Sequence, residues 1–186
     1  YHDLRLLLAA RESRRCVRGL PLSRALRLVE ELTEAVDAAA VGRLTADSLL
    51  RLRRRELAHD AVAASAVLAG MLPAQRTHHT LNHPTNAFLA GVVPLVIRRL
   101  AEAGIVLDPA PQAPEREMLG GIRAPVTAAA RAAFPGVPAG QWTGPGWLVD
   151  GVRIPEEEVA RAQLAWSARH PGCVDAGLTR HAETLE

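Results

Sequence analysis

The sequence lacks several features that mark common protein classes. It contains no lysine, so all 22 basic residues are arginine, and 20 acidic residues nearly balance them. A net charge of +2, without a one-sided basic excess, argues against a nucleic-acid-binding protein. The two cysteines, Cys16 and Cys173, are too few for a disulfide-rich scaffold, and we therefore expect a reduced, cytoplasmic setting.

Long hydrophobic runs are also absent. No stretch approaches the ~20 uninterrupted apolar residues of a membrane span, and no secretory signal peptide opens the chain. Because the sequence starts at Tyr1 without a methionine, we expect it to be a piece of a longer protein. Its 186 residues, 48% of them hydrophobic, are enough to bury a core, and we predict a single, mainly helical domain over residues 1–186.

Residues 1–104 are predicted to form a helical core. The spacing of apolar residues predicts a helix over Leu20–Ala40 and a second over Thr45–Gly70, for which the Thr45 hydroxyl is the expected N-cap. A third helix is predicted over Pro84–Gly104. Pro94 lies within this third helix and is expected to kink it or to split it in two.

The composition changes in residues 105–155. Eight of the 13 prolines and eight of the 14 glycines lie between residues 104 and 155, which is typical of loops joined by short helices. Such helices are expected near Glu115 and over Val126–Ala133. Trp142 and Trp147 flank a Gly-Pro-Gly sequence and are expected either to pack a hairpin onto the helices or to wall a pocket.

The clearest β signal lies at the end of this region. Trp147–Val149 and Val152–Ile154 are separated by Asp150-Gly151, a pair that favours a tight hairpin turn. Residues 156–186 are predicted to form C-terminal helices, the first of which ends at Arg169. The predicted fold class is therefore mainly α with one short β-hairpin.

Three charged side chains fall within the apolar arc of the helix predicted over Thr45–Gly70. At about 100° per residue, Arg53, Glu56 and Asp60 share the face that carries apolar residues such as Leu57. Removing two carboxylates from water is costly unless cations or donors pair with them. The cluster indicates either a functional site or a structural ion pair between Arg53 and Glu56.

Three histidines and two asparagines occur in the segment Thr77–Asn86, on the loop predicted before the helix at Pro84. Free amides and the helix dipole make such an entry suitable for an anion. The alternatives are histidine catalysis, a metal site, or simple helix capping by Asn82 or His83. No Cys, Asp or Glu stands nearby to complete a metal set, so we favour catalysis or phosphate binding and expect no metal.

Several standard catalytic signatures are missing from the sequence. It contains no G-x-S-x-G, no phosphate-binding loop that ends in Gly-Lys-Ser/Thr, no G-x-G-x-x-G and no paired C-x-x-C. The tandem His78-His79 does not complete the H-H-x-x-x-D motif of some coenzyme-A acyltransferases, because His83 occupies the position of the aspartate.

The order of these residues resembles a known family. Arg55-Glu56, then Asp60, then Thr80-Leu-Asn82-His83-Pro84-Thr85 before an apolar helix is similar to the C-terminal half of the WcbI-type family, capsular-polysaccharide biosynthesis proteins described as coenzyme-A-dependent acetyltransferases. The opening Tyr1-His2-Asp3-Leu4-Arg5 also resembles a segment of that family, and the likeness is clearest over residues 1–105.

One motif of that family is missing from this chain. The Gly-Asn-Cys-Gln motif, which a preceding α/β segment carries in that family, does not occur in this chain. The resemblance therefore implies that this chain is the C-terminal part of a larger α/β protein, or that a second chain supplies the N-terminal α/β portion.

At the matching positions, the resemblance implies that coenzyme A, entering as acetyl-CoA, meets the acceptor in a cleft lined by Glu56, Asp60, His79, Asn82 and His83. Acyl transfer to a hydroxyl requires a base, donors for the oxyanion, and positive groups for the phosphates of the donor. His79 or His83 is the expected base because a histidine titrates near neutral pH. Asp60 or Glu56 is the expected carboxylate that fixes its tautomer.

The remaining candidate residues are assigned to binding of the acyl donor. Asn82 and the amides after Pro84 are expected to hold an oxyanion or a phosphate. Arg53 or Arg76 is expected to pair with phosphate oxygens. The hydroxyls of Thr80 and Thr85 are further expected contacts.

The leading hypothesis is therefore an enzyme that transfers an acyl group, acetyl in the first instance, from coenzyme A to a sugar or another hydroxyl acceptor. Two alternatives stay open. One is a non-catalytic helical docking module of a larger assembly. The other is a metal-dependent hydrolase that uses His78, His79 or His83 together with Asp60.

Overall fold

The computed structural model describes residues 4–15, 21–80, 82–107, 114, 116–141, 144–180 and 182. In this part of the chain the fold is mainly helical with two small antiparallel sheets, which confirms the predicted fold class. The chain divides into two compact units, residues 1–36 with 154–186 and residues 37–153. The prediction of one domain is not tested by this division, and each unit is described by itself.

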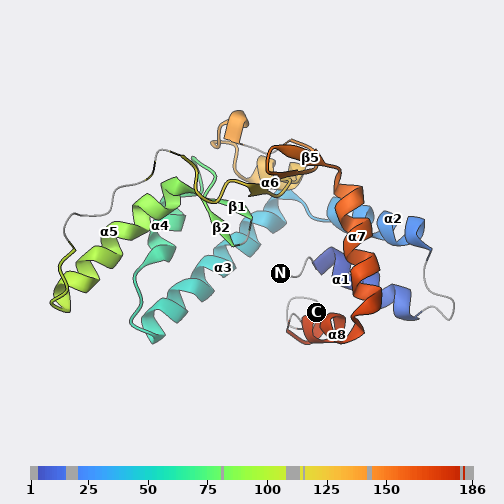
Figure 1. Cartoon of the computed structure of the whole chain (residues 1–186), viewed down its shortest axis with the longest axis horizontal. Coiled ribbons are helices and arrows are strands. Elements are labelled where there is room, and N and C mark those ends of the chain that lie inside the picture. Colours follow the sequence, from blue (N-terminus) through green and yellow to red (C-terminus); the bar gives the residue numbers. More distant parts are fainter. Residues whose placement is uncertain are drawn as a thin grey trace. The chain divides into compact units, whose positions relative to one another are not determined.

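The first unit packs helices from both ends of the chain together (Figure 1). Its helices are α1 (Leu4–Arg15), α2 (Leu22–Glu34), α7 (Glu156–Arg169) and α8 (Pro171–Arg180). α1 contacts the other three. Leu6 and Ala9 of α1 are buried against α2 and α7, and Leu7 and Ala10 are buried against Val174 of α8. Two pairs of leucine and alanine, each three residues apart, thus let one helix serve two faces of the core.

The predicted C-terminal helix is confirmed. α7 follows Pro155 and ends at Arg169, as expected from the His170-Pro171 pair that comes next. Three glutamates occupy its first turn, where negative charge is favoured by the helix dipole.

Among the described residues, the strands and a 3-10 turn lie in the second unit with further helices, and the last strand ends where the chain passes into the first unit. α3 packs against α4 and α6, and α4 packs against α5 (Figure 1). β1 and β2 pair with each other, and β3, β4 and β5 form the second sheet. The bounds are α3 (Ala38–Ala58), α4 (Ala64–Met71), β1 (His78–Thr80), β2 (His83–Pro84), α5 (Asn86–Glu102), β3 (Ile122–Arg123), α6 (Ala128–Ala133), η1 (Ala139–Gln141), β4 (Trp147–Val149) and β5 (Val152–Ile154).

Two predicted helix boundaries near residue 40 are wrong. The helix expected over Leu20–Ala40 ends at Glu34, and α3 begins well before Thr45. The cause is Asp37, whose carboxylate accepts a hydrogen bond of 2.6 Å from the amide nitrogen of Ala40 and caps α3.

The helix predicted over Thr45–Gly70 is divided into α3 and α4. Asp60 adopts a left-handed backbone conformation with φ of 51°, and the amide of Ala61 donates a hydrogen bond of 2.9 Å to the carbonyl of Glu56, which ends α3. The Glu56 carboxylate, 8% exposed, accepts hydrogen bonds from the Ser65 amide at 2.8 Å and from the Ser65 hydroxyl. Glu56 therefore satisfies the first turn of α4 and joins the two helices.

This break changes which side chains share a face. Leu57, which the pattern places in the apolar arc, is 76% exposed. The ion pair expected between Arg53 and Glu56 is not formed, because Arg53 is exposed and Glu56 binds Ser65 instead. A continuous helical face across Asp60 was thus the wrong prediction, since a left-handed residue redirects the chain.

The third predicted helix is present with a shifted start. α5 begins at Asn86 rather than at Pro84, because the Thr85 hydroxyl accepts a hydrogen bond of 3.2 Å from the amide of Phe88 and caps the helix. Pro94 lies inside α5, and the helix continues through it, so the predicted split does not occur.

The predicted β-hairpin is confirmed. Asp150 and Gly151 have φ angles of 47° and 84°, which the tight turn between β4 and β5 requires. The helix predicted over Val126–Ala133 begins two residues later as α6, after the Thr127 cap. The pairing of β1 with β2, and the strand β3 beside β4, were not predicted.

Some predictions concern residues outside the described part of the chain. These are the position of Trp142 and any pairing of Cys16. Glu115 itself also lies outside that part, but residues 114 and 116–121 around it are described and form no helix. Among the described residues, no helix is both long enough and apolar enough to cross a membrane.

We predict that Glu56→Ala destabilises the second unit by about 2 kcal/mol or more, because it leaves the buried amide and hydroxyl of Ser65 without an acceptor. Urea unfolding followed by circular dichroism measures the effect. Asp47→Ala, which removes an exposed carboxylate from the same helix, is the matched control and is expected to change little. Equal stability of the two variants would contradict the capping role.

Candidate functional site

The strands β1 and β2, called the histidine hairpin below, carry the three histidines singled out from the sequence. The Nδ1 atom of His78 lies 3.1 Å from the Thr77 hydroxyl, and its ring centroid lies 4.9 Å from that of Phe88. The amide and the hydroxyl of Thr85 donate hydrogen bonds of 2.9 and 3.1 Å to the carbonyl of Thr77. These contacts hold the histidine hairpin against the first turn of α5.

His79 is the buried histidine of this hairpin, with 6% of its surface exposed. Its Nε2 lies 3.3 Å from Oε1 of Glu117, within ion-pair distance, yet neither ring nitrogen makes a well-aligned hydrogen bond to any described residue. Burial lowers the pKa of His79, and the nearby Glu117 carboxylate opposes that shift only in part. The lowered pKa favours the neutral imidazole at pH 7, and both of its ring nitrogens are buried without an aligned hydrogen-bond partner among the described residues.

Glu117 occupies the position predicted for a bound anion. The same Oε1 atom that faces His79 accepts a hydrogen bond of 2.7 Å from the amide of Asn86, the first residue of α5. An amide at a helix start favours negative charge. The chain thus places its own carboxylate at this helix end, between the amide of Asn86 and the ring of His79.

The side chain of Asn86 holds the segment around Glu117 in place. Its amide group donates hydrogen bonds to the carbonyls of Pro114 at 2.9 Å and Arg116 at 2.8 Å. Its carbonyl oxygen accepts a hydrogen bond of 3.1 Å from the amide of Met118. Three bonds from one side chain fix the backbone on both sides of Glu117.

Arg76 also supports the histidine hairpin, through hydrogen bonds to its backbone. Its guanidinium donates hydrogen bonds to the carbonyls of His78 at 2.7 Å, His79 at 2.8 Å and Ala124 at 3.1 Å. Burial and the neighbouring Arg123 lower the pKa of Arg76. The amide of Ala124 also donates to the carbonyl of His79 at 2.9 Å, so Arg76 and Ala124 both bind this carbonyl.

The second strand of the hairpin is more open. Nδ1 of His83 bonds to the hydroxyl of Thr80, which orients the imidazole. His83 is partly buried, and Asn82 beside it is exposed. Among the predicted site residues of the hairpin, Asn82, His83 and Thr80 thus keep some access to solvent, whereas His79 is buried.

The two predicted carboxylates lie elsewhere. Asp60 is 80% exposed and pairs with Arg99, whereas Glu117 and His79 lie at Asn86. Asn86 and Arg99 are 13 residues apart on α5, a rise of about 20 Å. Glu56 is bound to Ser65. The structure therefore supplies His79 with a carboxylate other than the two that the sequence suggested.

The predicted site residues thus fall into two groups. The structure brings one group together around the start of α5, namely Arg76, His79, Thr80, Asn82, His83 and Thr85. Arg53 and Glu56 lie on α3 and Asp60 at the turn after it; Glu56 binds Ser65 and Asp60 binds Arg99 rather than a member of this group. The prediction missed Glu117 and Arg123. For Glu117 the sequence did offer a signal: acidic residues are scarce between positions 103 and 149, and Glu117 is one of only three there.

The described residues contain no group of three or more His, Cys, Asp or Glu close enough together to hold a metal ion. The hydrolase alternative requires Asp60 next to a histidine of the hairpin. Asp60 pairs instead with Arg99, near the other end of α5.

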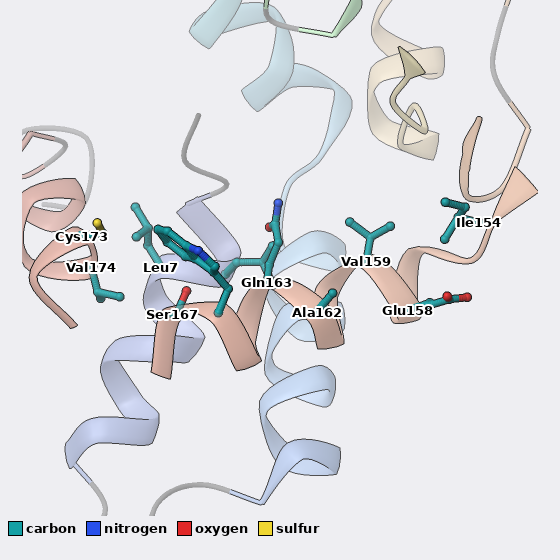
Figure 2. A pocket seen from close by; sticks show the side chains of 11 residues that line it. Leu7, Ile154, Glu158, Val159, Ala162, Gln163, Ser167, Cys173 and Val174 are labelled. Atoms are coloured by element: carbon teal, nitrogen blue, oxygen red, sulfur yellow. The ribbon is translucent and has the colours of Figure 1, made fainter. Parts of the chain in front are cut away.

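A separate cavity of about 450 Å³ lies within the first unit. Figure 2 shows Ile154 and Glu158 at one end and Cys173 and Val174 at the other, with Gln163 between them. The walls are mostly apolar side chains of α1, α7 and α8. None of the residues predicted for catalysis lines it, so we treat the histidine hairpin as the candidate site.

We predict that the histidine hairpin makes stability depend on pH. The pKa values of His78 and His79 are lowered in the folded state, so the unfolded chain binds more protons near pH 6.5. Their contribution is fully present above about pH 6.5 and is lost as the pH falls further, by at most ~1.4 kcal/mol per pH unit for each histidine.

Urea unfolding between about pH 7.5 and 5.5 measures this slope. His79→Gln is expected to reduce it, whereas His59→Gln, which replaces an exposed histidine at the end of α3, should leave it unchanged. A wild-type slope in His79→Gln would show that burial of His79 has no such linkage.

The comparisons with known proteins bear on the hairpin directly. The family model described as "Polysaccharide biosynthesis enzyme WcbI" matches residues 1–104, which include α1 to α5 and both strands of the hairpin but not Glu117 or Arg123. No curated protein and no solved structure matches the chain. The expectation that the likeness concerns the C-terminal half of the family is not supported. Since the match covers more than half of the 186 residues, the chain belongs to the WcbI family of polysaccharide biosynthesis enzymes.

Proposed function

We propose that this protein transfers an acyl group, acetyl in the first instance, from coenzyme A to a hydroxyl of a sugar or a similar acceptor during polysaccharide biosynthesis. Family membership supports the polysaccharide setting. The observation that carries the reaction type is His79, a buried, neutral imidazole whose ring nitrogens lack an aligned partner among the described residues and which lies beside a carboxylate. That combination suits a general base at neutral pH.

In the proposed reaction one imidazole, that of His79, takes a proton and later returns it. The acceptor hydroxyl oxygen attacks the thioester carbonyl carbon while His79 takes the hydroxyl proton. The tetrahedral intermediate then collapses, the carbon–sulfur bond breaks, and the imidazolium returns its proton to the leaving thiolate. The products are the acyl ester and free coenzyme A. No metal or further co-reactant enters this balance.

The open side of the hairpin is where we place the reacting groups. His83 is partly buried with its ring held by Thr80, and Asn82 is exposed, so both can donate a hydrogen bond to the developing oxyanion. Transition-state donors of this kind stabilise charge most when their position is fixed in advance, which the Thr80 contact provides for His83.

Phosphate binding is assigned differently from the sequence-based expectation. The Thr85 hydroxyl caps α5, the Arg76 guanidinium bonds to backbone carbonyls, and the start of α5 holds Glu117. These groups are already engaged in contacts within the chain, so we do not assign phosphate binding to them. Arg53 has an exposed guanidinium and stays the proposed contact for the phosphates of the donor.

We predict that His79→Gln lowers kcat/KM for acetyl transfer by about 10²–10⁴-fold, because the base is lost. The measurement follows thiol release from acetyl-CoA by the full chain, with a panel of sugars as acceptors, and mass spectrometry of the acetylated product. His83→Ala should lower kcat by a smaller factor through the loss of an oxyanion donor. His59→Gln, a histidine remote from the hairpin in sequence and exposed, is the matched control.

Two outcomes would count against the proposal. Full activity of a folded His79→Gln protein would remove His79 as the base. Wild-type protein that shows neither thiol release nor an increase in melting temperature with coenzyme A would favour the docking-module alternative.

A further inference from the structure

We propose that Glu117 is the positioning residue for His79: its carboxylate, 3.3 Å from Nε2, favours the tautomer with the proton on Nε2 and leaves Nδ1 as the atom that takes the proton. The inference rests on the proposed function in that it assumes His79 to be the base. It adds a residue that lies outside the family match and outside the set suggested by the sequence.

The carboxylate stands where such a group is needed. Oε1 of Glu117 lies 3.3 Å from Nε2 of His79, and the Glu117 side chain is 31% exposed, so it is only partly removed from water. Of the acidic groups of the described chain, it is the one found in ion-pair contact with a histidine. A carboxylate facing one nitrogen selects the tautomer with its proton on that nitrogen.

The position of Glu117 is itself fixed by several contacts. Its Oε1 accepts the Asn86 amide at 2.7 Å, and the Asn86 side chain binds the backbone on both sides of it. Gly120 contributes by its lack of a side chain, because a Cβ there would lie 2.8 Å from Cγ of Glu117. A positioning group must not move between conformations, and these contacts restrict it.

The positive charges around His79 oppose protonation of its ring, so the ring needs the Glu117 carboxylate in order to accept a proton. Arg76 and Arg123 both disfavour a second positive charge on the ring, and so does burial. His78 is the adjacent titratable group on the same strand. Taking a proton at Nδ1 creates an imidazolium in this setting, and Glu117 is the negative group in contact that stabilises it.

A simpler role for Glu117 is to cap α5, since it accepts the Asn86 amide. The two roles separate in Glu117→Gln. The glutamine side chain keeps an oxygen that can accept the Asn86 amide, but it has no charge to hold the imidazolium. A pure cap therefore predicts nearly normal behaviour, whereas a positioning residue predicts a change at His79.

Histidine ring NMR of the full chain tests the proposal without relying on activity. In the wild type we expect His79 to carry its proton on Nε2, and in Glu117→Gln we expect its pKa to fall further. Acetyl transfer by Glu117→Gln should drop on the order of 10²–10⁴-fold in kcat with a melting temperature within about 2 °C of wild type. Glu102→Gln, an exposed carboxylate at the other end of α5, is the matched control.

The outcomes distinguish this inference from the proposed function. A proton on Nδ1 in the wild type, an unmoved His79 titration in Glu117→Gln, or a shifted titration with unchanged kcat would each overturn the positioning role. If the His79 titration shifts as expected but wild-type protein transfers no acyl group, the contact of Glu117 with His79 stands and the proposed reaction is wrong. Should Glu117→Gln fail to fold, the wild-type tautomer alone decides.

Discussion

The first turn of α5 is the constraint on which the candidate site depends. Its cap, Thr85, donates to the carbonyl of Thr77, which precedes the hairpin. Its first residue, Asn86, binds Glu117 and the carbonyl of Pro114, which follow the helix in sequence. The same turn therefore sets the position of the histidine hairpin and of the carboxylate that faces it. Since a helix start has unsatisfied amides, it supplies the donors that make this convergence favourable.

Around that turn, electrostatic demands oppose each other. Burial and two arginines lower the pKa of His79, and the Glu117 carboxylate raises it. A histidine kept fully charged could not act as a base, and one buried without any negative neighbour could not carry a proton through a reaction. The arrangement leaves the ring neutral while placing the compensating charge within 3.3 Å, a combination typical of acid–base sites rather than of structural ion pairs.

Local sequence signals predicted what local interactions determine. The Asp150-Gly151 turn, the helix after Pro155 and the general helical character all follow from residues close in sequence. The break at Asp60 was missed because a left-handed aspartate and a carboxylate that caps a helix nine residues later leave no trace in periodicity. The hairpin histidines were identified from composition, but the carboxylate partner was assigned to Asp60 or Glu56, since sequence order cannot show that position 117 folds back onto position 79.

The location of Glu117 has a consequence for how the family match is interpreted. The matched residues 1–104 hold the proposed base, whereas the carboxylate, Arg123 and the strand edge at Ala124 that closes over His79 come from the segment that follows. A chain cut at residue 104 would keep all three hairpin histidines but lose the negative neighbour of His79 and one of its backbone partners. The imidazole would then lack the carboxylate that opposes the effect of burial on its pKa. If Glu117 positions His79 as we propose, the segment after α5 is part of the catalytic apparatus rather than an appendage to it.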